Sequence, residues 1–226
     1  MKKAALHNLG CKVNAYETEA MQHLLEEAGY EIVPFTQKAD VYVINTCSVT
    51  NMADRKSRQM LHKAKKNNPD SIVVAAGCYV QTSEKEVLND LSVDIVIGND
   101  RKHDLVRLLE EYSLDSVNDT VDDINDGKHD FEELFIDQTK EHTRAFIKVQ
   151  DGCNQFCSYC IIPYARGRVR SRRFENVIAE VERLAANGFK EVVLTGIHLS
   201  SYGVDFEEAT GLLELIQAVN AAKGIE

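Results

Sequence analysis

The sequence predicts an α/β protein in two parts, an open parallel-sheet domain at the amino end and the first βα units of a partial TIM-type barrel at the carboxyl end. In the first part, four short apolar runs alternate with amphipathic stretches. In the second part, two strand-like runs flank a cysteine-rich loop, and an acidic segment separates the two parts. Strands rich in Val and Ile that alternate with helices are typical of a buried parallel sheet with right-handed crossovers.

The four apolar runs of the first part have the length of buried strands. They are AALHNL at 4–9, VYVINTC at 41–47, IVVAAGC at 72–78 and DIVIG at 94–98. The first helix is expected to have Asn14 as its N-cap, with Glu17 three residues on, and to end at Gly29. A second helix is expected over about 53–66, and the domain is expected to end near Tyr112.

The second part is expected to contain two strands and two helices. In order, it has a strand at 144–150, a cysteine-rich loop, a helix over about 175–187 closed by Gly188, a strand at 191–196 and an amphipathic, helical stretch at 209–222. Two such units are too few to close a barrel, because an eight-unit barrel takes roughly 250 residues.

The negative charge of the chain lies in one segment. The formal net charge is −10, yet residues 1–109 carry 14 basic and 14 acidic side chains, and residues 144–226 carry 10 of each. Residues 110–143 hold 12 acids against Lys128 and Lys140. The overall charge therefore excludes no class of partner, nucleic acid included.

Composition and strand pattern together divide the chain into three segments. We expect an amino-terminal domain over 1–112, an acidic linker over 113–143 and an incomplete second domain over 144–226. A linker of this composition is expected to be solvated and to hold the flanking domains apart. The sequence is expected to be the front half of a longer protein, and this half alone is expected to be inactive.

The chain is expected to be cytoplasmic and without a membrane partner. It has no run of about 18 apolar residues, and its start, MKKAALHNLGCKVN, does not have the pattern of a signal peptide. Because the cytoplasm keeps thiols reduced, the six cysteines are more often metal ligands or catalytic thiols than disulfides.

Three cysteines form a C-x3-C-x2-C loop directly after the strand at 144–150: Cys153, Cys157 and Cys160. Spacings this short allow three thiolates to surround one small inorganic core. A [4Fe–4S] cluster normally takes four cysteines, so three would leave one iron open to a small ligand. The alternatives are a zinc site and a ferredoxin-type cluster, both of which need a fourth ligand, and the nearest other cysteine is Cys78.

The other three cysteines each follow a predicted strand: Cys11, Cys47 and Cys78. The carboxyl ends of parallel strands gather along one edge of a sheet, where such folds bind their ligands. Glycine before Cys11 and Cys78 would let the backbone approach a bulky ligand. The alternative is that they are three unrelated cysteines in a core.

These motifs together resemble the radical S-adenosylmethionine (SAM) methylthiotransferase family. The loop C-x3-C-x-aromatic-C, with Tyr159 at the aromatic position, is similar to the hallmark of the radical SAM superfamily. LGCKVNAYETE, VINTCSVT and AAGCYVQ resemble the cysteine motifs of the family's amino-terminal domain, and DGCNQFCSYCIIPYARGRVRSR resembles its radical motif. LGCKVN and LTGIH, near Ile197, most resemble the branch that modifies N6-threonylcarbamoyladenosine at position 37, in the anticodon loop of tRNA.

The resemblance implies two [4Fe–4S] clusters, one on each cysteine trio, with SAM on the open iron of the loop cluster. One electron from that cluster would break a C–S bond of SAM and release a 5′-deoxyadenosyl radical that abstracts hydrogen. A methylated sulfur on the second cluster would then be coupled to C2 of the adenine. The resemblance also implies an electron donor as a partner, and RNA rather than DNA as the nucleic acid.

Three residues are implied to contact SAM. Tyr159 would lie near the adenine, and Thr195 and Gly196 would receive the methionyl amino group. The alternatives are a hydrophobic plug over the cluster for Tyr159 and a plain strand-to-loop turn for the other two.

Two basic stretches are candidates for RNA contact. The first contains five arginines after the cysteine loop: Arg166, Arg168, Arg170, Arg172 and Arg173. An extended backbone would place the first four on one face, where they would bind phosphates. Their alternatives are a cofactor carboxylate or ion pairs with Glu175, Glu180 and Glu182. The second candidate is the helix that bears Arg55, Lys56, Arg58, Lys63, Lys65 and Lys66, and its alternative is an ordinary solvated helix face.

Two other functions remain open beside tRNA methylthiolation. A relative in the same family modifies an aspartate of a small-subunit ribosomal protein and shares both cysteine trios. A non-enzymatic iron–sulfur electron carrier would show no dependence on SAM. The family's carboxyl-terminal RNA-binding domain is not in this sequence, so the chain as given is expected to bind tRNA poorly.

Overall fold

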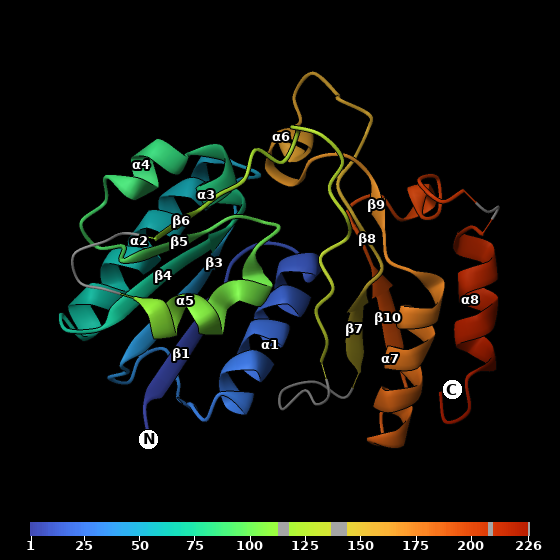
Figure 1. The fold of residues 1–226 in the computed structure, drawn as a ribbon, viewed down its shortest axis with the longest axis horizontal. Coiled ribbons are helices and arrows are strands. Elements are labelled where there is room, and N and C mark those ends of the chain that lie inside the picture. The colour runs from blue at the N-terminus through green and yellow to red at the C-terminus, as the bar shows by residue number, and fades with distance from the viewer. Residues whose placement is uncertain (113–117, 137–143, 208–209, 226) are drawn as a thin grey trace.

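The computed structural model describes residues 1–112, 118–136, 144–207 and 210–225 (Figure 1). Two units lie side by side, an open six-stranded sheet with helices on both faces and a smaller unit around a pair of parallel strands. The predicted α/β fold class, with an open parallel sheet followed by the first βα units of a barrel, is confirmed.

The large sheet is parallel throughout and has the strand order β2-β1-β3-β4-β5-β6. Its strands are β1 (Lys3–Asn8), β2 (Glu31–Ile32), β3 (Val41–Thr46), β4 (Ile72–Gly77), β5 (Ile95–Ile97) and β6 (Asn118–Thr120). Four of them are the apolar runs read from the sequence, and every residue of β3 is buried. Burial on both faces explains why these strands are continuously apolar instead of alternating.

Helices cover both faces of this sheet. They are α1 (Lys12–Glu27), α2 (Asn51–Asn67), α3 (Cys78–Thr82), α4 (Glu84–Leu88) and α5 (Leu105–Glu111), with a short 3-10 turn, η1 (Lys102–Asp104), before α5. On one face, Leu25 of α1 and Leu105 of α5 pack in a cluster with Val43 of β3. On the other face, Leu61 of α2 packs in a cluster with Ile44 of the same strand.

The start of α1 differs from the sequence prediction. Its N-cap is Cys11, and Asn14 lies inside the first turn. The Asn14 amide donates to the carbonyl oxygens of Leu9 at 2.8 Å and Thr46 at 2.9 Å, so it joins the ends of two strands instead of capping the helix. The predicted stop is confirmed, because Gly29 follows the last turn with a φ of +83°.

The smaller unit contains the strands and helices expected after the cysteine loop. The strands β7 (Ala145–Lys148) and β10 (Val192–Thr195) are parallel, and β8 (Gln150–Asp151) and β9 (Arg170–Ser171) pair antiparallel beside the loop. The helices are α6 (Ile162–Arg166), α7 (Phe174–Ala186) and α8 (Leu212–Ala221), with a 3-10 turn, η2 (Leu199–Ser201).

The described part of the acidic segment, 118–136, is a solvated spacer only in part. β6 joins the large sheet, whereas most side chains at 122–130 are exposed. Leu134 and Ile136 are buried in an apolar cluster that also contains Tyr16 of α1 and Val177 of α7. The backbone of this segment passes beside α1, as the yellow-green trace in Figure 1 shows. The rest of the expected linker, 113–117 and 137–143, lies outside the described residues.

In the described part of the chain, every helix is too short or too polar to cross a bilayer.

Candidate functional site

The cysteines of the first trio, Cys11, Cys47 and Cys78, are called the first cysteine set here. Cys11 caps α1 just after β1, Cys47 follows β3, and Cys78 begins α3 directly after β4. These three strands are neighbours in the sheet, so their carboxyl ends lie along one edge, as expected for an open α/β fold.

A glycine makes room for one of these thiols. Gly10 has a φ of +102°, and a Cβ on it would lie 2.7 Å from Cys47 Sγ. Real Cβ atoms do not approach a sulfur this closely, so only glycine permits Cys47 to sit against the start of α1. The expected role of this glycine, to let the backbone approach a bulky ligand, stays a prediction.

The three thiols lie within electrostatic reach of one another. Burial raises the pKa of the Cys47 thiol, and the neighbouring charges of Cys78 and Cys11 raise it further. Cys47 and Cys78 are buried, whereas Cys11 is exposed. A ligand bound to the first cysteine set would therefore have one open side, at Cys11.

Two asparagines lie against these thiols. The Cys11 thiol points to Asn14 Oδ1 with an Sγ–Oδ1 distance of 3.8 Å, and Asn99 Nδ2 donates to Cys78 Sγ at 3.6 Å. Amide donors and acceptors of this kind orient sulfur ligands and adjust the electron density on them.

The second trio, Cys153, Cys157 and Cys160, is called the loop cysteine set. Its loop leaves β8 through Gly152, whose φ is +67° and whose added Cβ would lie 1.9 Å from the carbonyl oxygen of Arg168. The loop is also held by the Cys153 amide, which donates to the Gly167 carbonyl at 3.0 Å. Cys157 is exposed and the other two thiols are half-buried, so the set faces outward from a firmly anchored base.

The donor chemistry of both sets fits iron–sulfur clusters. Within the described ranges, no three His, Cys, Asp or Glu side chains are arranged to hold a single metal ion. In a [4Fe–4S] cube each thiolate binds a different iron atom, so its ligands stand farther apart than those of one ion. Donor sets made only of thiols also favour soft metals over calcium or magnesium.

A buried network of ion pairs connects α1, which begins next to Cys11, with residues on both sides of the cysteine loop. Glu17 Oε1 of α1 lies 2.7 Å from Lys148 Nζ and 2.9 Å from Arg166 Nη1. Asp151 lies 2.6 Å from Lys148 Nζ and 3.0 Å from Arg166 Nη1, and Lys102 Nζ lies 3.4 Å from Glu17 Oε2. All five side chains are almost completely buried.

The cations of this network outnumber its carboxylates by three to two. Burial opposes ionisation of the Glu17 carboxyl, but Arg166, Lys102 and Lys148 outweigh it and hold its pKa well below the usual range. The pKa of Asp151 is lowered in the same way, with burial opposed by Arg166 and Lys148. Both carboxylates are therefore ionised at neutral pH.

The sequence did not lead us to expect this network, although polar residues on the buried face of α1 are one indication of it. Asn14 and Glu17 are three residues apart and share a helix face with the buried Met21. Polar side chains on the apolar face of a helix need buried partners.

Two family models match separate parts of the chain. The model described as "uncharacterized protein family UPF0004" matches residues 3–98, and the "radical SAM superfamily" model matches residues 147–225. The chain is also 46% identical to the threonylcarbamoyladenosine tRNA methylthiotransferase MtaB of Bacillus subtilis, across 100% of this chain and 51% of that protein. The chain thus carries a UPF0004 region followed by a radical SAM region.

Other relatives match nearly the whole chain as well. MtaB of Aquifex aeolicus is 44% identical across 99% of the chain and 54% of its own length. A tRNA-2-methylthio-N(6)-dimethylallyladenosine synthase of Thermoanaerobacter is 35% identical across 98% of the chain and 48% of its own length. The chain thus spans about half the length of the curated methylthiotransferases it matches.

A solved structure supports the fold. The radical S-adenosylmethionine methyltransferase TsrM of Kitasatospora setae superposes with a TM-score of 0.56 and 15% sequence identity, over 87% of this chain and 48% of that chain. Membership of the radical SAM superfamily implies SAM and one [4Fe–4S] cluster as cofactors.

The residues expected to bind SAM lie near the loop cysteine set. Thr195 ends β10 opposite Lys148 of β7, and an added Cβ on Gly196 would lie 3.0 Å from Gln150 Oε1. Gln150 Nε2 in turn donates to the Gly152 carbonyl at 2.8 Å, at the base of the cysteine loop. Tyr159 is 91% exposed, which leaves its ring available to a ligand.

The arginines after the loop do not form the face that the sequence suggested. Arg166 ends α6 and is buried, Arg170 is buried against Asp100, and Arg172 is buried in an ion pair with Glu180. The extended-face prediction is wrong for these three, because burial between the units leaves them no route to RNA. The alternative of pairing with Glu180 is confirmed for Arg172.

Arg168 and Arg173 are the exposed members of the same stretch. The Arg168 guanidinium stacks on the ring of Phe156 at 4.3 Å, beside the loop cysteine set. These two arginines remain candidates for phosphate contact.

The basic side chains of α2 are used in part within the protein. Arg58 donates to the Tyr79 hydroxyl at 3.0 Å and Lys65 Nζ lies 2.7 Å from Asp94. Lys56 and Lys63 are exposed. The helix therefore presents a solvated face, which is the alternative to RNA contact given for it above.

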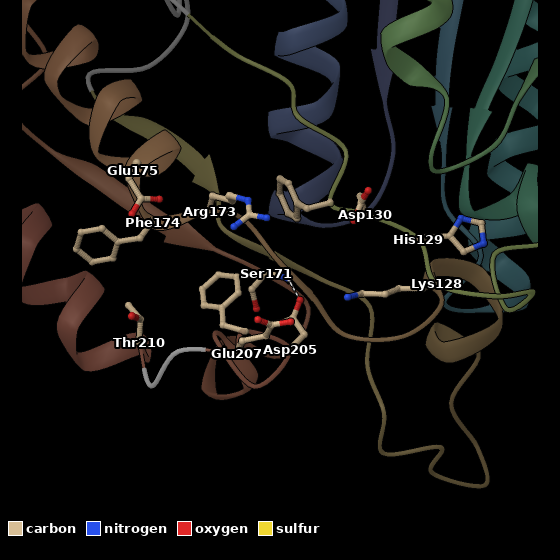
Figure 2. Close-up of a pocket in the computed structure, with 12 residues that line it drawn as sticks. Lys128, His129, Asp130, Ser171, Arg173, Phe174, Glu175, Asp205, Glu207 and Thr210 are labelled. Atoms are coloured by element: carbon tan, nitrogen blue, oxygen red, sulfur yellow. Dashed lines mark hydrogen bonds between the residues drawn. The ribbon is translucent and has the colours of Figure 1, made fainter.

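A cavity of about 370 Å³ lies between the acidic segment and the start of α7. Figure 2 shows Lys128 and Arg173 near Asp205 and Glu175, with the Ser171 amide donating to Asp205 at 2.9 Å. Because cations and carboxylates are mixed and no cysteine lines it, the cavity does not mark the site of radical chemistry.

Proposed function

We propose that the full-length protein transfers a methylthio group to C2 of N6-threonylcarbamoyladenosine at position 37, in the anticodon loop of tRNA, and that it does so in the cytoplasm. The observation that carries the proposal is the presence of two cysteine trios in adjoining units, at the carboxyl ends of strands, linked by one buried ionic network. The names of the relatives at 38–46% identity support the same substrate.

Each cysteine set has a distinct role in this proposal. The loop cysteine set would hold the cluster that supplies the electron for cleavage of SAM, and the first cysteine set would hold the second [4Fe–4S] cluster, which carries the sulfur to be transferred. Thr195 and Gly196 would receive the methionyl end of SAM, and Tyr159 would pack near its adenine. A separate redox protein would supply the electrons that the loop cluster needs for cleavage of SAM.

In this proposal, each cysteine set belongs to one of the two predicted domains. Residues 1–112, extended by β6 of the sheet, would form the domain of the first cysteine set. The rest of 113–143 would form the connection, and 144–226 the first part of the radical domain. The salt bridges of Glu17 with Lys148 and Arg166 support a fixed arrangement of the two domains during the reaction.

The test uses full-length protein, reconstituted anaerobically with iron and sulfide and supplied with a reductant, SAM and tRNA that carries N6-threonylcarbamoyladenosine. Mass spectrometry of the digested nucleosides is expected to show a gain of one methylthio group, and chromatography is expected to show 5′-deoxyadenosine. Replacement of the loop cysteine set by Ala is expected to abolish both products. Replacement of the first cysteine set is expected to abolish only the methylthio product.

Two results would contradict the proposal and favour the alternatives. Cleavage of SAM with methylthiolation of a small-subunit ribosomal protein, and none of tRNA, would assign the aspartate-modifying activity. A protein that holds clusters but never cleaves SAM would be an electron carrier.

A further inference from the structure

Arg166 belongs to the radical unit by sequence, yet its side chain is completely buried against the sheet domain. Its Nη2 donates to Asn14 Oδ1 at 2.6 Å, and its Nη1 donates to Glu17 Oε1 at 2.9 Å and to Asp151 Oδ1 at 3.0 Å. The guanidinium therefore joins the first turns of α1 to the strand that leads into the cysteine loop.

Two short paths connect the end of α6 with thiols of the first cysteine set. Asn14 Oδ1, which accepts from Arg166, also lies 3.8 Å from Cys11 Sγ. Asn99 Nδ2 donates to the carbonyl oxygen of Ala165 at 2.6 Å and to Cys78 Sγ at 3.6 Å. Through these asparagines, two consecutive residues of the radical unit reach two of the three thiols of the other domain.

One donor of Arg166 is left over. Its Nε is buried and has no hydrogen-bond partner among the residues that the structure describes. A buried N–H without an acceptor costs about 1–3 kcal/mol, so native proteins rarely leave one. An acceptor that is not a protein group, such as a cluster sulfide, would satisfy it.

The charge of Arg166 also acts on the thiols. Burial works against the charged guanidinium, but Asp151, Cys78 and Glu17 outweigh it and hold the pKa of Arg166 well above its usual value. The arginine therefore stays charged in its buried position, with a cysteine among the groups that stabilise it.

We propose that Arg166 is a positioning residue for the cluster of the first cysteine set, which it reaches from the radical unit and whose negative charge it partly neutralises. This inference rests on the proposed function, because it takes Cys11, Cys47 and Cys78 as cluster ligands. Hydrogen bonds and charges around a cluster set its reduction potential. Reduction adds negative charge, so a fixed cation favours the reduced form and raises the potential.

The test uses full-length protein with the loop cysteine set replaced by Ala, so that only the first cysteine set can hold a cluster. Iron and sulfide are counted after anaerobic reconstitution, and the potential is measured by redox titration followed by electron paramagnetic resonance. Arg166→Gln is expected to lose half or more of the cluster or to lower its potential. Arg166→Lys keeps the charge and is expected to stay closer to the parent protein in both measurements.

Arg172→Gln is the matched control. Arg172 is as deeply buried as Arg166 at the same interface, but its hydrogen bonds go to Tyr16, Glu133, Leu134 and Glu180. Its loss is expected to lower the unfolding midpoint without a shift in potential. Should Arg166→Gln fail to fold, Glu17→Gln/Arg166→Gln is compared with Glu17→Gln, since the double change also removes the carboxylate that pairs with Arg166.

The outcomes separate this inference from the proposed function. An Arg166→Gln protein with the cluster content and potential of its parent overturns the inference alone, and so do equal shifts in Arg166→Gln and Arg172→Gln. A parent protein that takes up no cluster overturns the proposed function, and the inference with it.

Discussion

Arg166 and Glu17 form a salt bridge with an Nη1–Oε1 distance of 2.9 Å, and neither side chain reaches solvent. Glu17 comes from α1 of the sheet domain and Arg166 from α6 of the radical unit. The first cysteine set begins at the N-cap of α1, and the loop cysteine set directly precedes α6. This pair therefore fixes the two candidate cluster sites relative to each other.

Glu17→Gln is expected to destabilise the contact between the two units. The change leaves Arg166, Lys102 and Lys148 buried with one carboxylate fewer, and breaking a buried pair by removing one partner costs about 3–5 kcal/mol. Urea unfolding of the full-length protein measures the effect. The control is Glu31→Gln, whose partner Lys3 is 4.0 Å away and exposed, and whose loss is expected to cost less than about 1 kcal/mol. Equal effects of the two changes would contradict the importance of the network.

The contribution of Glu17 is expected to disappear in acid. Its pKa in the folded protein is well below that of an unfolded glutamate, about 4.3, so the stabilisation is complete above that pH and declines as the pH falls toward the folded value. The difference in unfolding midpoint between the wild-type protein and Glu17→Gln should therefore be constant from pH 7 to about pH 5 and shrink below about pH 4. A difference that grows as the pH falls would contradict a lowered pKa for Glu17 in the folded protein.

Gly152→Ala is expected to disrupt the loop cysteine set. The added Cβ would lie 1.9 Å from the Arg168 carbonyl oxygen, so the backbone at the base of the loop must move. In full-length protein with the first cysteine set replaced by Ala, the variant is expected to lose half or more of its iron. Gly127→Ala is the control, since Gly127 also has a positive φ, +80°, but has nothing within 4 Å of an added Cβ. If both variants kept their iron, the close approach at Gly152 would have no role in cluster binding.

Arg168 and Arg173 are expected to contribute to the salt dependence of tRNA binding. Both are exposed, and each lost phosphate contact should reduce the slope of log Kobs against log salt concentration by about 0.7–0.9. Filter binding of tRNA to full-length Arg168→Ala/Arg173→Ala at several salt concentrations measures the slope. Lys56→Ala on the solvated face of α2 is the control and should leave the slope unchanged. An unchanged slope in the double variant would remove these arginines from the RNA contact surface.

The sheet could be predicted from sequence because its strands are buried on both faces. Runs such as 41–47 and 72–78 contain almost only apolar residues and are followed by a cysteine, so both the strand and its functional end are visible in the sequence. The loop cysteine set was visible for a similar reason, since its ligands are neighbours along the chain.

The contact between the two units could not be predicted in this way. Asn14 has the residue type of an N-cap, but Thr46 and Arg166 use its amide, and neither contact is local in sequence. Leu134 and Ile136 lie among acids, and their burial depends on the surface that α1 and α7 present together. The arginine stretch was misjudged because long-range ion pairs, not the local pattern, decide which side chains are buried.

The central claim is tested most directly by counting iron and sulfide in the anaerobically reconstituted full-length protein. The account predicts about eight iron atoms per chain, and about half of that number when either the first cysteine set or the loop cysteine set is replaced by Ala. A folded wild-type protein with about four iron atoms, all of them lost when a single set is replaced, would contradict it.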